Sequence, residues 1–427
     1  MIHPVTTDDV ESVVYFMNPI IDANFIYDGG TAAMDSSKFK YNTQKFEIRH
    51  LLETALLRDD LINGRYHPQP GDKFWISERG KTRCITSNTM RDKAVNHVLC
   101  DQIVMPAIKP YLIYDNGASQ KGKGVSFARK RFESHLHNYY REYGTNEGYV
   151  LLTDFSGYYA NIRHDRCKEI LNGFVLPTIV DDEQGIIRCL VEHLIDEIFR
   201  SFELDVSYLS DEKINALYHS KVNPMMNDGV DKSLLTGEKT LKKGVDIGNQ
   251  LSQAVGIVFA YLVDNYVKIV CGQKYYGRYT DDGHLINRSK EVLLKVLDGI
   301  RKIADLLGLI LNEGKTRICK LSQFFRYLQI GYTLTDTGRL IRKINPKSVT
   351  RERKKLKAYK RLLSDHRIDY ETVENSFKSW LGGNWKNMSH QQIYGMNSLY
   401  KELFGKEVRW KKGHSRLHWL MEHSCTI

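Results

Sequence analysis

The sequence lacks the features of several protein classes. Its 427 residues contain only seven cysteines, and no two of these form a Cys-x-x-Cys pair. This usage gives no zinc site or disulfide framework and is typical of a reduced, intracellular protein. No apolar run predicts a bilayer span, and the first residues lack the charged and then apolar pattern of a secretory signal. We therefore expect a cytoplasmic protein with no membrane partner.

Acidic residues are in deficit. Lys and Arg total 62 against 51 Asp and Glu, which gives a formal net charge of +11. Such an excess suits a protein that follows a phosphate backbone. Between residues 342 and 361, ten of twenty residues are Lys or Arg and only Glu352 is acidic. One sign of charge at this density favours a polyanion partner, so Arg351, Lys354 and Lys355 are candidate nucleic-acid contacts.

Two adjacent carboxylates stand in a predicted hairpin turn, Tyr279-Thr280-Asp281-Asp282. A third, Asp154, ends the β-branched, apolar run 149–153, which predicts a buried strand with an acid at its tip. Three acids on neighbouring strand ends could hold two Mg²⁺ ions, because Mg²⁺ prefers oxygen ligands. Such a pair of ions supports in-line phosphoryl transfer. A solvated surface hairpin with an Asp-Gly turn is the alternative for the turn taken alone.

These motifs resemble those of reverse transcriptases in their residues and order. Segment 154–162 resembles the first catalytic motif, 248–253 the dNTP-site motif and 279–282 the catalytic hairpin. Segments 311–316 and 327–331 fall where the next two family motifs stand. The resemblance implies an RNA-directed DNA polymerase that takes dNTPs and an RNA template and makes DNA. It also implies two Mg²⁺ ions as cofactors, with Mn²⁺ as an alternative.

The resemblance assigns roles to individual residues. Asp154, Asp281 and Asp282 would be the catalytic metal ligands, with the backbone carbonyl of Phe155 as an extra ligand. The candidate nucleotide-binding residues are Lys81, Arg83, Tyr159, Gly248, Gln250 and Lys315. The further candidate nucleic-acid contacts are Ser252, Arg129 and Lys130.

Some of these residues could instead have a purely structural or solvent-exposed role. Tyr159 matches the position whose bulk excludes a ribose 2′-OH, whereas Tyr158 better fits a core aromatic. Lys81 and Arg83 lie in a predicted basic hairpin that would reach the triphosphate, or that would simply be an exposed turn. Lys315 would neutralise charge or protonate the leaving pyrophosphate, or else be a solvated lysine.

The implied fold is an α+β right-hand polymerase with an antiparallel-sheet palm and a helical thumb. The expected parts are an N-terminal helical extension (1–70), fingers (71–145), palm (146–200 and 244–335), an insertion (201–243) and a basic helical thumb with a cap (336–427). The insertion accounts for the 94-residue separation of Asp154 and Gly248. We expect Trp380, Trp385, Trp410 and Trp419 to be core anchors rather than base-stacking platforms.

The biological role is narrowed by two departures from the retroviral pattern. Ile247 precedes the glycine of the dNTP-site motif, and Gln253 follows its serine. Both bring the sequence closer to bacterial enzymes of anti-phage defence and of diversity-generating retroelements. Our first expectation is a defence enzyme that copies a structured non-coding RNA, and the retroelement enzyme is second. An RNA-templated RNA polymerase, a non-catalytic RNA-binding scaffold, a homo-oligomer and an accessory protein stay open.

Overall fold

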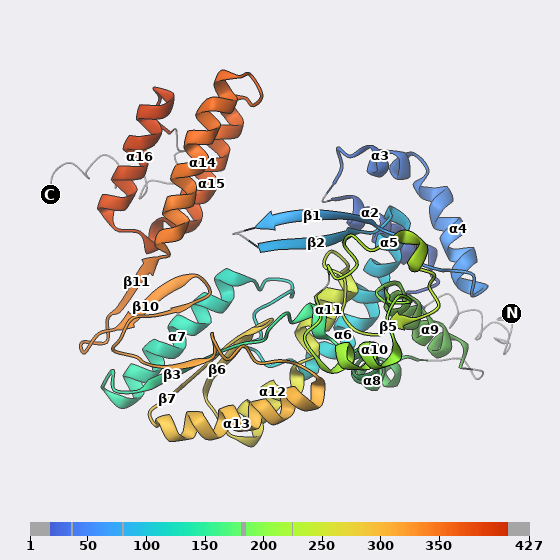
Figure 1. Ribbon diagram of the computed structural model, residues 1–427, viewed down its shortest axis with the longest axis horizontal. Coiled ribbons are helices and arrows are strands. Elements are labelled where there is room, and N and C mark those ends of the chain that lie inside the picture. The colour runs from blue at the N-terminus through green and yellow to red at the C-terminus, as the bar shows by residue number, and fades with distance from the viewer. Residues whose placement is uncertain (1–17, 36, 79–80, 181–184, 224, 409–427) are drawn as a thin grey trace, which may run out of the picture. The chain divides into compact units, whose positions relative to one another are not determined.

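The computed structural model describes residues 18–35, 37–78, 81–180, 185–223 and 225–408 (Figure 1). They form two compact units. The first covers 1–131, 151–285 and 291–317 as far as these residues are described, and the second covers 132–150, 286–290 and 318–427 in the same sense. Helices and strands are mixed throughout, which confirms the expected α+β class.

The first unit begins with helices. In chain order they are α2 (Ala23–Asp35), α3 (Tyr41–Ile48), α4 (His50–Ile62), α5 (Met90–Val98), a π-helical turn (Leu99–Val104) and α6 (Met105–Ile108). Thr89 starts α5 by accepting a hydrogen bond from the Asp92 amide, as an N-cap does. Between α4 and α5, strands β1 (Asp72–Glu78) and β2 (Lys81–Ser87) form an antiparallel ribbon that pairs Trp75 with Cys84 (Figure 1). The expected hairpin tip, Arg79 and Gly80, lies outside the described residues.

A four-stranded sheet has the order β6-β7-β3-β8, and its strands carry the first catalytic motif and the catalytic hairpin. Its strands are β3 (Tyr149–Asp154), β6 (Tyr275–Tyr279), β7 (Asp282–Asn287) and β8 (Arg317–Lys320). The apolar run that predicted β3 is buried at Val150, Leu151 and Leu152. The helices nearest to it in sequence are α7 (Val125–Tyr143), α8 (His164–Val175), α9 (Ile186–Ser201) and α13 (Lys290–Leu307).

The segment predicted as an insertion contains a small cluster of its own. Strands β4 (Leu204–Asp205) and β5 (Thr240–Leu241) pair, and helix α10 (Asp211–His219) lies between them in sequence. Val206, Val222 and Leu241 form the buried cluster. Lys243 links the end of this segment to the C-terminal end of α10. Its Nζ donates to the carbonyl of Tyr218, in the last turn of the helix, at 2.9 Å and to that of Ser220, directly after the helix, at 2.6 Å. Burial lowers the pKa of Lys243 to about 8.

One helical stretch corrects the expectation about membrane spans. The stretch consists of helix α11 (Gln250–Val258), helix α12 (Tyr261–Asn265) and a π-helical turn (Tyr266–Val270). Judged by length and composition alone, it could cross a bilayer. More than half of the most apolar window is buried inside the structure. Val255, Val258 and Phe259 are fully buried. The stretch therefore packs as a core helix, as its helical apolar spacing predicts.

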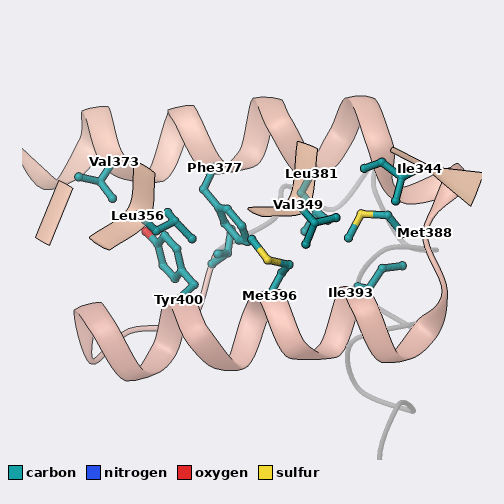
Figure 2. Packing of buried hydrophobic residues seen from close by; sticks show 11 residues of the cluster. Ile344, Val349, Leu356, Val373, Phe377, Leu381, Met388, Ile393, Met396 and Tyr400 are labelled. Atoms are coloured by element: carbon teal, nitrogen blue, oxygen red, sulfur yellow. The ribbon is translucent and has the colours of Figure 1, made fainter. Parts of the chain in front are cut away.

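The second unit combines a three-stranded sheet with a helical bundle. Strands β9 (Phe325–Tyr327), β10 (Ile330–Leu334) and β11 (Leu340–Ile344) form the sheet in the order β11-β10-β9. Helices α14 (Pro346–Ser364), α15 (Tyr370–Asn384) and α16 (His390–Phe404) form the bundle. Figure 2 shows Phe377, Met396 and Tyr400 pointing into its core, where each is fully buried. Trp380 and Trp385 pack against this core, and Trp410 and Trp419 lie outside the described residues.

Candidate active site

The catalytic-hairpin motif forms a tight turn with an unusual backbone. Strands β6 and β7 are joined by Thr280 and Asp281, and Thr280 has φ of +49°. This conformation is uncommon for a β-branched residue. The Thr280 hydroxyl lies 2.9 Å from the Asp281 carboxylate and 2.8 Å from the Tyr279 carbonyl. Contacts of the Thr280 hydroxyl within the turn therefore stabilise it, in addition to the pairing of its two strands.

The tip of β3 lies between this hairpin and the segment after α13. The Phe155 amide donates to the Asp281 carbonyl at 3.3 Å, and the Asn312 amide donates to the Asp154 carbonyl at 2.8 Å. The Asp154 carboxylate is engaged on both oxygens. It accepts hydrogen bonds from Lys315 Nζ at 2.7 and 2.8 Å and from Asn312 Nδ2 at 3.0 Å. Sequence motifs separated by more than a hundred residues therefore meet at one carboxylate.

Electrostatics links this carboxylate to the hairpin. Burial raises the pKa of Asp281, and the charge of Asp154 raises it further, whereas the Thr280 hydroxyl and Lys315 lower it. A buried carboxylate beside a second carboxylate is stabilised in its charged form by nearby positive charge. Lys315 is one source of that charge, and its side chain is about half exposed.

The oxygen donors of this site fit a divalent metal ion, because Mg²⁺ and Mn²⁺ both prefer carboxylate oxygens. Within the described part of the chain, no three His, Cys, Asp or Glu side chains surround a common point. Instead, the Lys315 ammonium group contacts both oxygens of Asp154 and so occupies a position to which this carboxylate attracts positive charge. Asp282 begins β7, directly after Asp281. The structure thus brings Asp154 and Asp281 together, with Asp282 as the next residue in the chain.

Tyr159 lies within the electrostatic influence of Asp281. It starts a short 3₁₀ turn (Tyr159–Asn161), and the Asp281 charge acts on it. Burial, with a contribution from Asp281, raises the pKa of Tyr159 to about 12. A Cβ atom added at Gly256 would overlap the Tyr159 hydroxyl, so glycine in α11 makes room for this ring. Tyr158 is buried instead, and its hydroxyl donates to the Gly256 carbonyl at 3.1 Å.

The dNTP-site motif packs closely against the rest of the structure. Gly248 has φ of +120°, and a Cβ there would overlap the Thr86 carbonyl, so the chain approaches strand β2 closely at this glycine. Ser252 is only 1% exposed in the first helical turns of α11. The roles of Gly248 at the nucleotide and of Ser252 at the nucleic acid stay predictions. Gln250 is accessible, and its Nε2 donates to Asp101 at 2.7 Å.

The basic candidates are distributed over three elements. Lys81 begins β2, where its side chain is not described, and Arg83 is exposed two residues later. Arg129 and Lys130 lie on α7, and the charge of Arg129 acts on Tyr279. On α14, Arg351 and Lys354 are exposed, whereas Lys355 pairs with the buried Glu352 at 3.0 Å. Lys315, one of the predicted cations, contacts the Asp154 carboxylate of the first catalytic motif.

Sequence reasoning missed one pair behind the hairpin. Arg278 of β6 and Asp264 of α12 form an ion pair in which both side chains are 1% exposed. A signal for it exists in the sequence. Each charge interrupts a segment rich in apolar or aromatic residues, and charges that are buried in such segments are paired.

The family described as "Reverse transcriptase (RNA-dependent DNA polymerase)" matches residues 68–334, which is more than half of the chain. No curated protein matches.

Similar solved structures include three structures of telomerase from two Candida species. Telomerase of Candida albicans, solved with a TWJ fragment of telomeric RNA, has 11% identity and a TM-score of 0.41, over 85% of this chain and 62% of that one. Apo telomerase of Candida tropicalis, truncated from the C-terminal domain, has 14% identity and a TM-score of 0.37, over 67% and 59%. The Candida tropicalis enzyme with the TWJ fragment has 12% identity and a TM-score of 0.39, over 87% and 64%. The chain thus spans less than two thirds of each of these proteins.

Proposed function

Because the chain belongs to the reverse transcriptase (RNA-dependent DNA polymerase) family, we propose that it extends a DNA strand along an RNA template by adding dNTPs. The observation that carries this proposal is the meeting of Asp154 and Asp281 at neighbouring strand ends, with Tyr159 within the electrostatic influence of Asp281. Carboxylates at a strand tip and in the neighbouring hairpin turn suit metal-assisted phosphoryl transfer.

The residues that would hold two Mg²⁺ ions are Asp154, Asp281 and Asp282, together with the Phe155 carbonyl. When bound, such ions stabilise the attacking and leaving oxygens of an in-line displacement. In that displacement the primer 3′-hydroxyl oxygen forms a bond to the α-phosphorus, and the bond to pyrophosphate breaks. Asp281 contributes only as a carboxylate, and its raised pKa therefore makes the reaction sensitive to acid. Lys315 balances the charge of Asp154 and could turn to the departing pyrophosphate.

In this proposal Tyr159 discriminates between deoxyribose and ribose nucleotides. Its ring is fixed against Gly256 and lies in the field of Asp281, so a sugar held at the carboxylates would meet it. The bulk of an aromatic ring there disfavours a ribose 2′-hydroxyl. Acceptance of NTPs as readily as dNTPs would instead favour an RNA-templated RNA polymerase.

We also propose the right-hand division into fingers, palm and thumb at the boundaries given above. The β1–β2 ribbon would belong to the fingers, the four-stranded sheet to the palm and the α14–α16 bundle to the thumb. Support for a thumb comes from α14, which presents Arg351 and Lys354 to solvent in the most basic part of the chain. Positive charge on a helix suits the phosphates of a template–primer duplex.

The biological proposal is a bacterial, cytoplasmic enzyme that copies an associated, structured non-coding RNA in anti-phage defence. It is supported by Ile247 and Gln253 in the dNTP-site motif and by the insertion at 201–243, which carries its own buried cluster and so offers a separate surface for RNA. A diversity-generating retroelement enzyme is the second candidate. It is favoured by the same two residues and would be identified by a neighbouring template repeat.

The test uses the protein with whatever nucleic acid accompanies it from its native locus. The complex is supplied with dNTPs or NTPs and Mg²⁺, and the product is sequenced, with Asp281→Asn/Asp282→Asn as the matched control. DNA that copies a neighbouring non-coding RNA and is absent in the control supports the proposal. Equal product from both proteins would leave only the RNA-binding scaffold.

A further inference from the structure

Arg278 is the largest side chain that is almost fully buried, and it lies on the strand that leads into the catalytic hairpin. Its Nε donates to Asp264 Oδ1 at 2.8 Å, and its Nη2 donates to Oδ2 at 2.7 Å. The Tyr276 hydroxyl donates to the same carboxylate at 2.8 Å. Burying a charge pair is costly and does not by itself stabilise a fold, so such a pair calls for a reason beyond stability.

The remaining donors of the guanidinium reach two backbone carbonyls. Nη1 donates to the Thr280 carbonyl at 2.9 Å. Thr280 is the residue with positive φ, and it directly precedes Asp281. A carbonyl fixed by a buried, charged donor cannot rotate away freely, so the guanidinium holds the turn in its uncommon conformation.

The second carbonyl connects the hairpin to α11. Nη2 also donates to the Ile257 carbonyl at 2.8 Å, and Asn116 Nδ2 donates to the same oxygen at 3.0 Å. Ile257 follows Gly256, the residue against which the Tyr159 ring is placed. One guanidinium therefore touches the two elements that carry Asp281 and support Tyr159.

We propose that Arg278 is a positioning residue whose guanidinium, oriented by Asp264, fixes the Thr280 carbonyl and thereby presents the Asp281 carboxylate to a divalent metal ion. The inference rests on the proposed function only in assigning a metal to that carboxylate. Lysine cannot replace this arrangement, because its donors radiate from a single atom and cannot meet a carboxylate and two separate carbonyls in a fork.

The test compares the full-length protein with Arg278→Lys, using Mn²⁺ alone as the probe. Free Mn²⁺ is measured by electron paramagnetic resonance, and the folded fraction is measured by circular dichroism. We expect the variant to bind Mn²⁺ about 10- to 100-fold more weakly, the range seen when a residue that orients a metal ligand is lost. The Mg²⁺ concentration for half-maximal primer extension should rise in parallel.

Two further variants separate positioning from general stability. Tyr276→Phe removes a hydrogen bond to the same Asp264 carboxylate without touching Thr280, and it should keep Mn²⁺ affinity within about twofold of wild type. Asp264→Asn preserves the shape of the partner but weakens its hold on the guanidinium. It should therefore reproduce the effect of Arg278→Lys, and it serves as the second test if Arg278→Lys does not fold.

Wild-type Mn²⁺ affinity in a folded Arg278→Lys or Asp264→Asn protein would overturn the inference, as would unfolding of both variants, which assigns the pair to stability alone. The proposed function can fail separately. A wild-type protein whose Mn²⁺ binding depends on Asp281 and on Arg278, but which extends no primer, would contradict polymerase activity and support the positioning role.

Discussion

At the scale of residues, the chemistry depends on the electrostatic interaction between the Asp154 and Asp281 carboxylates. Asp281 is harder to ionise than a free aspartate because it is buried and because Asp154 is nearby. Lys315 opposes both effects from its position on Asp154. The balance among these three side chains sets the pH at which the site can attract a cation.

Replacing Lys315 by alanine tests this balance. Without the ammonium group, the pKa of Asp281 should rise further, so the carboxylate is protonated at higher pH than in wild type. We expect the acid limb of the profile of kcat/KM against pH to move to higher pH. The measurement is primer extension across pH 5 to 8, with Lys302→Ala on the exposed face of α13 as control. An acid limb at the wild-type position would contradict the account.

Single residues also show how far sequence reasoning reaches. Asp154 and Asp281 could be predicted because a carboxylate that ends a β-branched run, or stands in a tight turn, leaves a local signature. Ser252 was predicted as a nucleic-acid contact from motif resemblance, whereas helical spacing alone predicts a buried position for it. It lies on the buried face with Val255 and Phe259, three and seven residues away. The sequence signals that Arg278 and Asp264 each need a partner, but it could not predict that they pair with each other, because nothing local names the partner.

At the scale of elements, α11 matters through its closeness to the turn after β3. Gly256→Ala should favour the helix intrinsically, but the new methyl group would displace the Tyr159 ring. We expect the preference for dNTPs over NTPs to fall on the order of tenfold, as for other steric discriminations.

The matched control is Gly382→Ala on α15, where an added Cβ meets open space. It should leave sugar preference unchanged and stabilise its helix by about 0.5–1 kcal/mol. The ratio of kcat/KM for dNTP and NTP decides the matter. A wild-type ratio in folded Gly256→Ala would show that the ring position does not control discrimination.

Helix α8 adds a pH-dependent contribution to stability. His164 begins α8, and its Nε2 lies 2.5 Å from the Gly244 carbonyl. Burial lowers its pKa below the ordinary 6.5. The unfolded chain therefore binds more protons between the lowered pKa and pH 6.5, so stability falls as pH drops through this window.

The corresponding prediction concerns urea unfolding of the wild type and of His164→Gln, measured between pH 5 and 8. The wild type should lose at most about 1.4 kcal/mol per pH unit from this residue below pH 6.5. The variant should show a flatter dependence there and no difference in slope above pH 7. Parallel curves would mean that His164 does not couple protonation to folding.

Elements too short to show a hydrophobic periodicity could not be predicted from the sequence. Strands β4 and β5 have two residues each, so no alternation marks them, and their pairing depends on Val206, Val222 and Leu241 meeting in space. Strand β3 and helix α11 were predictable because each is long enough to show its periodicity. The close approach of Gly248 to Thr86 is likewise a tertiary contact.

At the scale of the whole molecule, the positive charge is concentrated rather than spread. The sequence predicts this concentration at 342–361, and α14 presents Arg351 and Lys354 to solvent there. Binding of an RNA–DNA duplex by phosphate contacts must weaken with salt, because each contact releases counterions. The charge pattern was readable from the sequence, since it needs no partner from elsewhere in the chain.

We predict that Arg351→Gln/Lys354→Gln reduces the slope of log Kd against log salt concentration by about two, one for each lost phosphate contact. The measurement is fluorescence anisotropy with a labelled RNA–DNA duplex at several salt concentrations. Lys38→Gln/Lys45→Gln, which removes the same charge from the exposed N-terminal region, is the control and should leave the slope unchanged. A slope reduced equally by both pairs would indicate general attraction rather than binding at α14.

The central claim is most directly tested by adding one nucleotide to a DNA primer on a defined RNA template. The account predicts that the wild-type protein adds the templated dNTP in the presence of Mg²⁺ and stops when the metal is chelated. Asp281→Asn, which keeps the shape of the side chain, should lower the rate by about 100-fold or more, the scale of losing one electrostatic group in an active site. Extension by Asp281→Asn at the wild-type rate would contradict the account.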